Sequence, residues 1–234
     1  MKREENSPLK KNTVDRIGLF GGTFNPIHNG HLRAAIEVAD KFNLSRIFFI
    51  PSYLPPHKKI NNVAPPENRL DMVRLATLRQ SKFEVSAVEL KRAGISYTVD
   101  TVKYYKQLYR EPDVLFLIVG MDAFLEIETW KSYAELFKLV PMIIMERPRP
   151  ENTMTPASIG MADFIQQYVS DEYQFQANER RYHHPELCSI YHIPISLLDI
   201  SGTKIRELLR NKKSITFLVP EAVEHYIITR GLYL

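Results

Sequence analysis

The strongest constraint on the fold of this chain is the alternation of short apolar runs with segments of helical periodicity. Six runs rich in β-branched and aromatic residues recur, at 17–20, 46–50, 83–88, 114–119, 139–145 and 190–193. Each is short and bounded by turn residues, which is typical of strands buried on both faces. Between them, apolar residues repeat at three- and four-residue steps in 32–39, 99–105 and 205–209. The alternation predicts an α/β fold, a Rossmann-like parallel sheet flanked by helices, with a ligand site at the carboxyl ends of the strands.

Proline and glycine positions indicate helix boundaries and the domain plan. Pro66 and Pro220 lie where a first helical turn would begin, and Gly231 lies where the last helix should end. Residues 1–14 are polar and basic, and they are predicted to form a flexible N-terminal tail. The remaining residues, 15–234, are predicted to form a single domain.

The region of about 147–185 breaks the alternation, because it carries four prolines and no clear strand. It is therefore predicted to be an insertion into the domain. Within it, Thr155 and Pro156 have the types expected of a helix N-cap and first helical residue. The apolar face of that helix would be formed by Phe164, Ile165, Tyr168 and Val169.

Composition excludes several classes of protein. No apolar run approaches the roughly 18 residues that cross a bilayer, and the N-terminus lacks the apolar stretch of a secretion signal, so a cytoplasmic protein is expected. A single cysteine, Cys188, excludes an internal disulfide and a cysteine-based zinc cluster. The formal net charge of +4 suits an anionic ligand but is too small to indicate nucleic-acid binding.

A glycine-rich turn, GGTFNPIHNGHL, follows the first predicted strand and enters a helix. Its glycines allow close approach of the backbone to a ligand, and the helix N-terminus supplies N–H donors at the positive end of the dipole. The turn is therefore suited to phosphate. It matches neither the dinucleotide motif G-x-G-x-x-G nor the P-loop, which disfavours hydride transfer and P-loop hydrolysis.

Two histidines in this turn are candidate catalytic residues. His28 and His31 are three residues apart, so at the start of a helix both imidazoles can point to one side, and Gly30 between them leaves room for a ligand. The pair lacks the further ligands of a metal site, so no metal site is predicted. As donors to polyphosphate oxygens the two rings fit well, although a purely structural role stays open.

A second candidate phosphate motif, DISGTKIR, lies near the C-terminus. Ser201 or Thr203 can cap the helix that follows, and Arg206 lies one turn into it. Free N–H groups and the guanidinium would then converge on anionic oxygens. An ordinary capped helix with a surface arginine is the alternative.

Both motifs resemble those of the nucleotidyltransferase superfamily with the H-x-G-H signature, whose members transfer a nucleoside monophosphate from a triphosphate to a small acceptor. The second motif departs from the superfamily pattern I-S-S-T-x-I-R at Gly202, where a serine is usual, so a hydroxyl contact is lost there. The resemblance implies catalytic roles for His28, His31 and Arg206. It also implies ATP contacts by Gly22, Thr23, Phe24, Gly30, Ile200, Ser201 and Thr203.

Four further segments resemble the nicotinate-nucleotide adenylyltransferase family: PSYLPPHK from Pro51, SYTVDT from Ser96, GMD from Gly120, and Trp130 before the next helix. The resemblance covers most of 15–146 and 189–234. It implies that Lys58 contacts ATP. It also implies that the acceptor is bound by Tyr97, Thr98, Asp122 and Trp130.

Each of these residues also has an ordinary structural explanation. Lys58 could be a solvated loop lysine rather than a phosphate ligand. Thr98 could cap a helix from Val99 instead of donating to a carboxylate. Asp122, after the fourth strand, could accept from ribose hydroxyls or cap a helix. Trp130 could stack on a pyridine ring or only pack.

The resemblance implies transfer of AMP from ATP to nicotinate mononucleotide, which yields nicotinate adenine dinucleotide and pyrophosphate in NAD biosynthesis. Mg²⁺ would arrive with ATP, since no carboxylate cluster marks a standing metal site. Three alternatives remain. The enzyme could use another acceptor, such as nicotinamide mononucleotide or phosphopantetheine, or it could transfer a cytidylyl group. The protein could also be a non-catalytic nucleotide-binding regulator. Nucleic-acid and membrane partners are not expected, and a homo-oligomer stays open.

Overall fold

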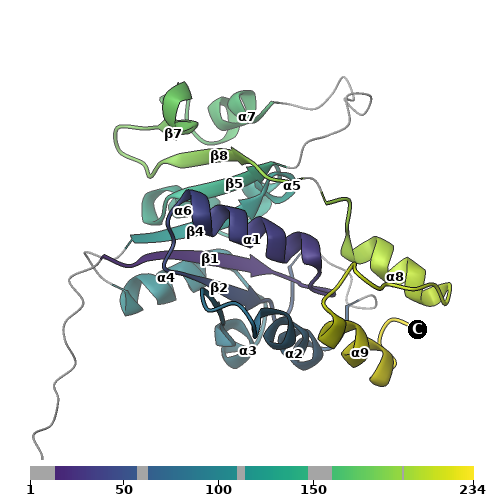
Figure 1. Cartoon of the computed structure of the whole chain (residues 1–234). Helices are drawn as coiled ribbons and strands as arrows, with labels where there is room; N and C mark the ends of the chain where they lie inside the picture. Colours follow the sequence, from purple (N-terminus) through teal and green to yellow (C-terminus); the bar gives the residue numbers. More distant parts are fainter. Residues whose placement is uncertain (1–13, 57–62, 110–113, 147–159, 197) are drawn as a thin grey trace, which may run out of the picture.

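The computed structural model describes residues 14–56, 63–109, 114–146, 160–196 and 198–234. In this part of the chain a central sheet is covered by helices on both faces (Figure 1). The strands are β1 (Arg16–Gly22), β2 (Arg46–Pro51), β3 (Phe83–Val85), β4 (Val114–Gly120), β5 (Met142–Glu146), β6 (Gln174–Gln176), β7 (Arg181–His183) and β8 (Ile190–Pro194). The α-helices are α1 (Asn29–Lys41), α2 (Pro66–Thr77), α3 (Val88–Arg92), α4 (Thr98–Leu108), α5 (Met121–Phe124), α6 (Tyr133–Leu139), α7 (Met161–Tyr168), α8 (Gly202–Arg210) and α9 (Glu221–Thr229).

The sheet has eight strands in the order β3-β2-β1-β4-β5-β8-β7-β6. The six strands from β3 to β8 in that order pair in parallel, as the alternation predicts. Their apolar residues point to both faces and form two separate cores. One core lies under α1, α2, α8 and α9, and the other lies under α4, α5, α6 and α7. The predicted Rossmann-like arrangement is therefore confirmed.

Two of the predicted strands are shorter than their apolar runs. The run 83–88 is a strand only as far as Val85, because Ser86 and Ala87 turn the chain and Val88 already begins α3. The run 139–145 begins with Leu139, the last residue of α6. Val140 precedes a proline, which disfavours helical backbone and makes it extended, with φ −154° and ψ 134°.

The region 147–185 contains strands that the sequence analysis did not predict. β6 and β7 pair antiparallel with each other, and β7 pairs antiparallel with β8, so the sheet is mixed rather than wholly parallel. Both strands have only three residues, too few for a visible two-residue alternation. Of the predicted apolar face, α7 carries Phe164 and Ile165 into the core, whereas Tyr168 is exposed and Val169 is the C-cap of the helix. Thr155 and Pro156 lie outside the described residues.

Helix boundaries follow the predicted signals within one or two residues. Pro66 is the first residue of α2, as expected. Pro220 precedes α9 as its N-cap instead of occupying the first turn, and Gly231 adopts a left-handed φ of 60° two residues after the helix ends. None of the helices in the described part of the chain combines the length and apolarity that a bilayer span requires. Of the predicted tail, only Val14 lies within the described residues.

Candidate active site

The candidate site lies at the carboxyl end of β1, where the order of strands reverses. The chain passes from β1 to its neighbour β2 on one side and later returns to β4 on the other. At such a switch point the adjoining crossovers cover opposite faces of the sheet and leave a crevice outside the strand ends. Gly21 and Gly22, the last residues of β1, line two cavities in this crevice. The alternation of strands and helices predicted a site at this edge.

The two histidines lie side by side at the start of α1. Their rings stack with centroids 3.6 Å apart and planes inclined by 26°, which confirms that the spacing directs both imidazoles to one side. The backbone N–H of His28 donates to Nδ1 of His31 at 3.2 Å. A neutral His31 then carries its proton on Nε2. His28 is buried, with 2% of its surface exposed.

Two glycines of the turn each leave space for a different aromatic ring. A Cβ on Gly30 would lie 3.1 Å from Nδ1 of His28, so this glycine makes room for the histidine ring. A Cβ on Gly22 would lie 3.1 Å from the ring of Phe24, which is itself buried and packs edge-on against His31 at 5.2 Å. The predicted space beside the histidines is thus partly filled by the His28 ring itself.

Arg206 joins the second motif to the first. Its Nη1 donates to the backbone carbonyl of Asn25 at 2.7 Å, and its Nη2 donates to Oγ1 of Thr203 at 3.2 Å. Its Nε is buried and has no partner in the described part of the chain. Burial lowers the pKa of Arg206, but an arginine keeps its charge at neutral pH. Ser201 is the N-cap of α8 and accepts from the backbone N–H of Lys204 at 3.2 Å, as one of the two predicted capping residues.

These groups converge on one cavity of about 440 Å³, here called the histidine cavity. Its polar lining residues all come from the two motifs and are Thr23, Asn25, His28, His31, Thr203 and Arg206, with Gly22, Phe24 and Gly202 beside them. Gly30, Ile200 and Ser201 do not line it in the described structure, so their predicted ATP contacts stay predictions. Lys58 lies outside the described residues.

A second cavity of about 350 Å³, here called the tryptophan cavity, adjoins the first. The two cavities share Phe20, Gly21, Gly22 and Thr23, so the β1 turn separates them. The tryptophan cavity brings together Tyr97, Thr98 and Trp130, which are three of the four predicted acceptor residues. Among its other lining residues are Ser52, Glu89, Ser96, Gly120, Glu126 and Lys131.

The fourth predicted acceptor residue, Asp122, is exposed in the first turn of α5 and does not line this cavity in the described structure. The alternative that it caps the helix is wrong, because Gly120 is the N-cap. Thr98 is likewise not a helix cap: α4 begins at Thr98 itself, and Tyr97 is the N-cap. The backbone N–H groups of the first turn of α4 therefore start at the cavity wall.

A buried arginine that the sequence analysis missed holds the loops of the site together. Arg69 on α2 has none of its surface exposed. Its Nε donates to the carbonyl of Ala64 at 2.9 Å, Nη1 to that of Thr23 at 2.7 Å, and Nη2 to that of Tyr53 at 3.0 Å. Burial lowers its pKa. The signal in the sequence was its spacing of four residues from Val73, which places Arg69 on the buried face of α2.

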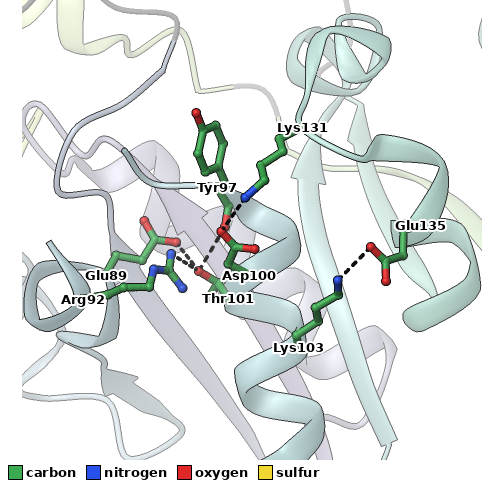
Figure 2. Close-up of polar contacts among 8 residues, drawn as sticks. All are labelled: Glu89, Arg92, Tyr97, Asp100, Thr101, Lys103, Lys131 and Glu135. Carbon is green, nitrogen blue, oxygen red and sulfur yellow. Dashed lines mark hydrogen bonds and ion pairs between the residues drawn. The ribbon is translucent and has the colours of Figure 1, made fainter. Parts of the chain in front are cut away.

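A polar network behind the tryptophan cavity was also not predicted (Figure 2). Thr101 donates to Oε1 of Glu89 at 2.6 Å and accepts from Nη2 of Arg92 at 3.1 Å. Burial is the main cause that raises the pKa of Glu89, against the effect of this hydrogen bond. Ser52, at the end of β2, adds a buried hydroxyl with no partner in the described part of the chain. Ser52 and Thr101 lie in segments that indicated the site, although no role was predicted for them, whereas Glu89 and Arg92 belong to none of those segments.

The described residues contain no group of three or more His, Cys, Asp or Glu placed to hold a metal ion. The arrangement instead presents two imidazoles, one guanidinium and a helix N-terminus to one cavity. Such groups bind polyphosphate oxygens. An aromatic ring and the N-terminus of α4 face the adjoining cavity.

Comparison with known proteins agrees with this chemistry. Residues 19–208 match the model of the family described as cytidylyltransferase-like. The chain therefore belongs to the cytidylyltransferase-like family, a class of nucleotidyltransferases.

Similar proteins narrow this assignment. A probable nicotinate-nucleotide adenylyltransferase from Geotalea uraniireducens (strain Rf4) is 41% identical over 218 residues, covering 93% of this chain and 98% of the relative. Another, from Desulfatibacillum aliphaticivorans, is 41% identical over 226 residues, covering 94% and 100%. Within the wider family, the chain belongs to the nicotinate-nucleotide adenylyltransferases. Because 93% of the chain is matched, the similarity extends through most of 147–188, where the motifs indicated no counterpart.

Solved structures show the same fold. The Plasmodium falciparum nicotinic acid mononucleotide adenylyltransferase complexed with NaAD matches with a TM-score of 0.68 at 19% identity, covering 94% of this chain and 97% of that one. At this identity the match supports the fold alone.

Proposed function

We propose that this protein transfers AMP from ATP to nicotinate mononucleotide, releasing pyrophosphate and forming nicotinate adenine dinucleotide. The observation that carries the proposal is the pair of cavities that meet on the Gly21–Thr23 turn. One presents His28, His31 and Arg206, and the other presents Trp130 and the start of α4. A phosphate donor in the first and a pyridine nucleotide in the second bring their reacting phosphates together at the shared turn.

The reaction needs orientation and charge neutralisation more than a protein nucleophile. A 5′-phosphate oxygen of the acceptor attacks the α-phosphorus of ATP, and the bond from that phosphorus to the bridging oxygen of pyrophosphate breaks. The attacking phosphate is already ionised, so no general base is required. Positioning both phosphates in line and stabilising the charge on the leaving pyrophosphate lowers the barrier.

The histidine cavity supplies this stabilisation. His31, His28 and Arg206 line the same cavity. The carbonyl bond to Asn25 occupies only part of the arginine fork, and the buried Nε retains a donor. Backbone N–H groups at the start of α8, where Gly202 and Thr203 line the cavity, add donors at the positive end of that helix. Mg²⁺ enters as part of the substrate, bound to ATP oxygens.

The tryptophan cavity selects the acceptor. Trp130 provides a flat surface for the pyridine ring. The first turn of α4, at Thr98, presents N–H donors that favour an anionic carboxylate over a neutral amide. Nicotinate mononucleotide is therefore the preferred acceptor, by about 10²-fold or more in kcat/KM, from one charge-assisted hydrogen bond and the helix terminus together.

Pyrophosphate release tests the proposal directly. The purified full chain is assayed with MgATP and, in separate reactions, nicotinate mononucleotide, nicotinamide mononucleotide and phosphopantetheine. Release with the first at a kcat/KM well above the others is expected. Release only with phosphopantetheine identifies a different adenylyltransferase, and ATP binding without release in any reaction identifies a regulator. Equal activity with the acid and the amide would contradict the assigned acceptor site.

A further inference from the structure

We infer that Lys131 is a specificity-determining residue, whose ammonium group binds the carboxylate that distinguishes the nicotinate acceptor from its amide. The inference rests on the proposed function, because it assigns a residue to the acceptor cavity of that reaction. Lys131 directly follows Trp130 and lines the same cavity. It matches none of the motifs that indicated the site, so its role comes from position alone.

The side chain of Lys131 reaches back over the start of α4 (Figure 2). Its Nζ lies 4.5 Å from the ring centroid of Tyr97, the N-cap of α4, and 3.2 Å from Oδ2 of Asp100. The ammonium therefore stands beside the same helix terminus whose N–H groups face the acceptor. A carboxylate placed at this terminus would meet a cation and backbone donors together.

The charges lining the tryptophan cavity make such a cation necessary. Among the described lining residues, Lys131 is the one basic side chain, while Glu89 and Glu126 are acidic. A carboxylate entering a cavity with two acidic residues and no opposing cation would be disfavoured by repulsion and by loss of water. Lys131 offsets that repulsion for the acid. The amide carries no charge and gains nothing from it.

Lys131 can exchange its ion-pair partner Asp100 for the carboxylate of the substrate. Its ion pair with Asp100 is partly exposed, with 47% and 35% of the two side chains accessible, and exposed pairs contribute little to stability. Lysine has a flexible stem and a compact charge that can rotate between acceptors. A substrate carboxylate that is more enclosed than Asp100 is therefore a better partner for the ammonium group.

The chain contains a matched control. Lys103 also extends from the α4 region into an ion pair that joins α4 to the following segment, with its Nζ 2.8 Å from Oε2 of Glu135 on α6. It lies one turn after Asp100, the partner of Lys131, and its side chain is exposed to a similar degree as that of Lys131, 45% against 47%. Lys103 does not line the tryptophan cavity. Removing either lysine cation breaks one ion pair between α4 and the segment 131–139, but only Lys131 lines the acceptor cavity.

The experiment compares Lys131→Met, Lys131→Arg and Lys103→Met with the wild-type enzyme. Calorimetry measures Kd for nicotinate and nicotinamide mononucleotides in the presence of a non-hydrolysable ATP analogue. Lys131→Met should reduce the acid-to-amide preference by about tenfold or more, through weaker binding of the acid alone. Lys103→Met should keep the wild-type ratio. Lys131→Arg should keep most of it, because the positive charge remains.

The outcomes separate this inference from the proposed function. An unchanged ratio in Lys131→Met overturns the assignment of Lys131, and so does an equal loss in Lys103→Met, which would indicate a general effect on α4. A wild-type protein that binds the acid no better than the amide overturns it as well. Pyrophosphate release by the wild-type enzyme is measured in parallel. Its absence, together with tight binding of the acid, would refute the transfer reaction while leaving the binding test of Lys131 valid.

Discussion

At the scale of single residues, contacts within the protein orient the two histidine rings of the site. His31 uses Nδ1 to accept from the backbone of His28, so its neutral ring carries the proton on Nε2. His28 is almost fully enclosed by the turn and by its stacked partner. Both rings are therefore oriented before any substrate binds, which is the condition for effective stabilisation of transition-state charge.

Replacement of His31 by alanine should lower kcat by about 10² or more, because one oriented donor to the leaving pyrophosphate is lost. His28→Ala should have a similar effect. Initial rates of pyrophosphate release measure kcat, and circular dichroism checks that each variant is folded. A folded His31→Ala enzyme with near-normal turnover would show that the stacked pair is only structural.

Arg206→Lys should lower kcat/KM by about tenfold or more, although the charge is kept. The guanidinium bonds the Asn25 carbonyl and Thr203 from separate nitrogens and still offers Nε, and an ammonium group cannot reproduce this planar arrangement. Steady-state kinetics with ATP as the varied substrate measure the loss. If the two enzymes have equal kcat/KM, Arg206 acts only as a distant charge.

At the scale of secondary-structure elements, the start of α8 is packed directly against the first motif. A Cβ at Gly202 would lie 2.8 Å from the carbonyl oxygen of Asn25 and 3.3 Å from Nη1 of Arg206. The neighbour is backbone, so it cannot rotate away. The glycine that departs from the superfamily pattern therefore permits α8 to approach the turn closely, and this contact could be recognised only in the folded chain.

Gly202→Ala should weaken catalysis and stability together, because the added methyl group pushes α8 away from Asn25 and displaces Arg206. We expect a loss of about tenfold in kcat/KM and about 1–3 kcal/mol in the free energy of unfolding, as for other overpacked sites. Gly160→Ala is the control: it adds the same methyl group at the start of α7, where the nearest atom is the side-chain Oδ2 of Asp163 at 3.3 Å. Similar kinetics for both variants would contradict the close-approach argument.

The junction of α3 and α4 should make stability depend on pH through Glu89. Burial raises the pKa of this carboxyl above its ordinary value of 4.5. Between that value and the raised one, the folded protein binds more protons at Glu89 than the unfolded chain does. The contribution of Glu89 is therefore most favourable at low pH and is lost as pH rises through this window.

Glu89→Gln removes the charge but keeps an oxygen that can accept from Thr101. The variant should gain stability relative to the wild type as pH rises from 4.5 through the raised pKa, because the wild type must ionise a buried carboxyl there and the variant does not. Thermal unfolding of both proteins across this range measures the difference. A difference that is constant with pH, or that narrows as pH rises, would refute the assignment.

At the scale of the whole molecule, the 160–185 segment shares a core with the rest of the sheet. The ring of Phe164 on α7 lies 5.5 Å from that of Phe124 on α5, and both belong to one buried cluster. β7 also extends the sheet from β8. The segment and the nucleotide-binding half should therefore unfold together.

Phe164→Ala should lower the stability of the entire chain by about 3–5 kcal/mol, the usual cost of removing a buried phenylalanine ring. The expected result is one cooperative thermal transition at a lower midpoint. Phe175 lies in the same segment but is half exposed, so Phe175→Ala should lower the midpoint of the thermal transition much less. Two separate transitions, with the main one unshifted, would show that the segment folds independently.

The α/β class, most strand positions and the two phosphate motifs could be predicted from the order of residues alone. Buried parallel strands need continuous apolar runs, and helices on their faces need a 3.6-residue period, so both leave local patterns. The paired histidines and Arg206 could be found because they belong to motifs at fixed spacing. Short strands such as β6 and β7 left no pattern, since three residues are too few to show one.

The residues that share a cavity could be identified only from the folded chain. Trp130, Tyr97 and the β1 turn come from segments far apart in the chain, and they meet because parallel strands end at one edge of the sheet. The buried Arg69, the close approach at Gly202 and the position of Lys131 beside Tyr97 depend on contacts between such segments. Packing distances and loss of water fix their roles, and neither is encoded in the local order of residues.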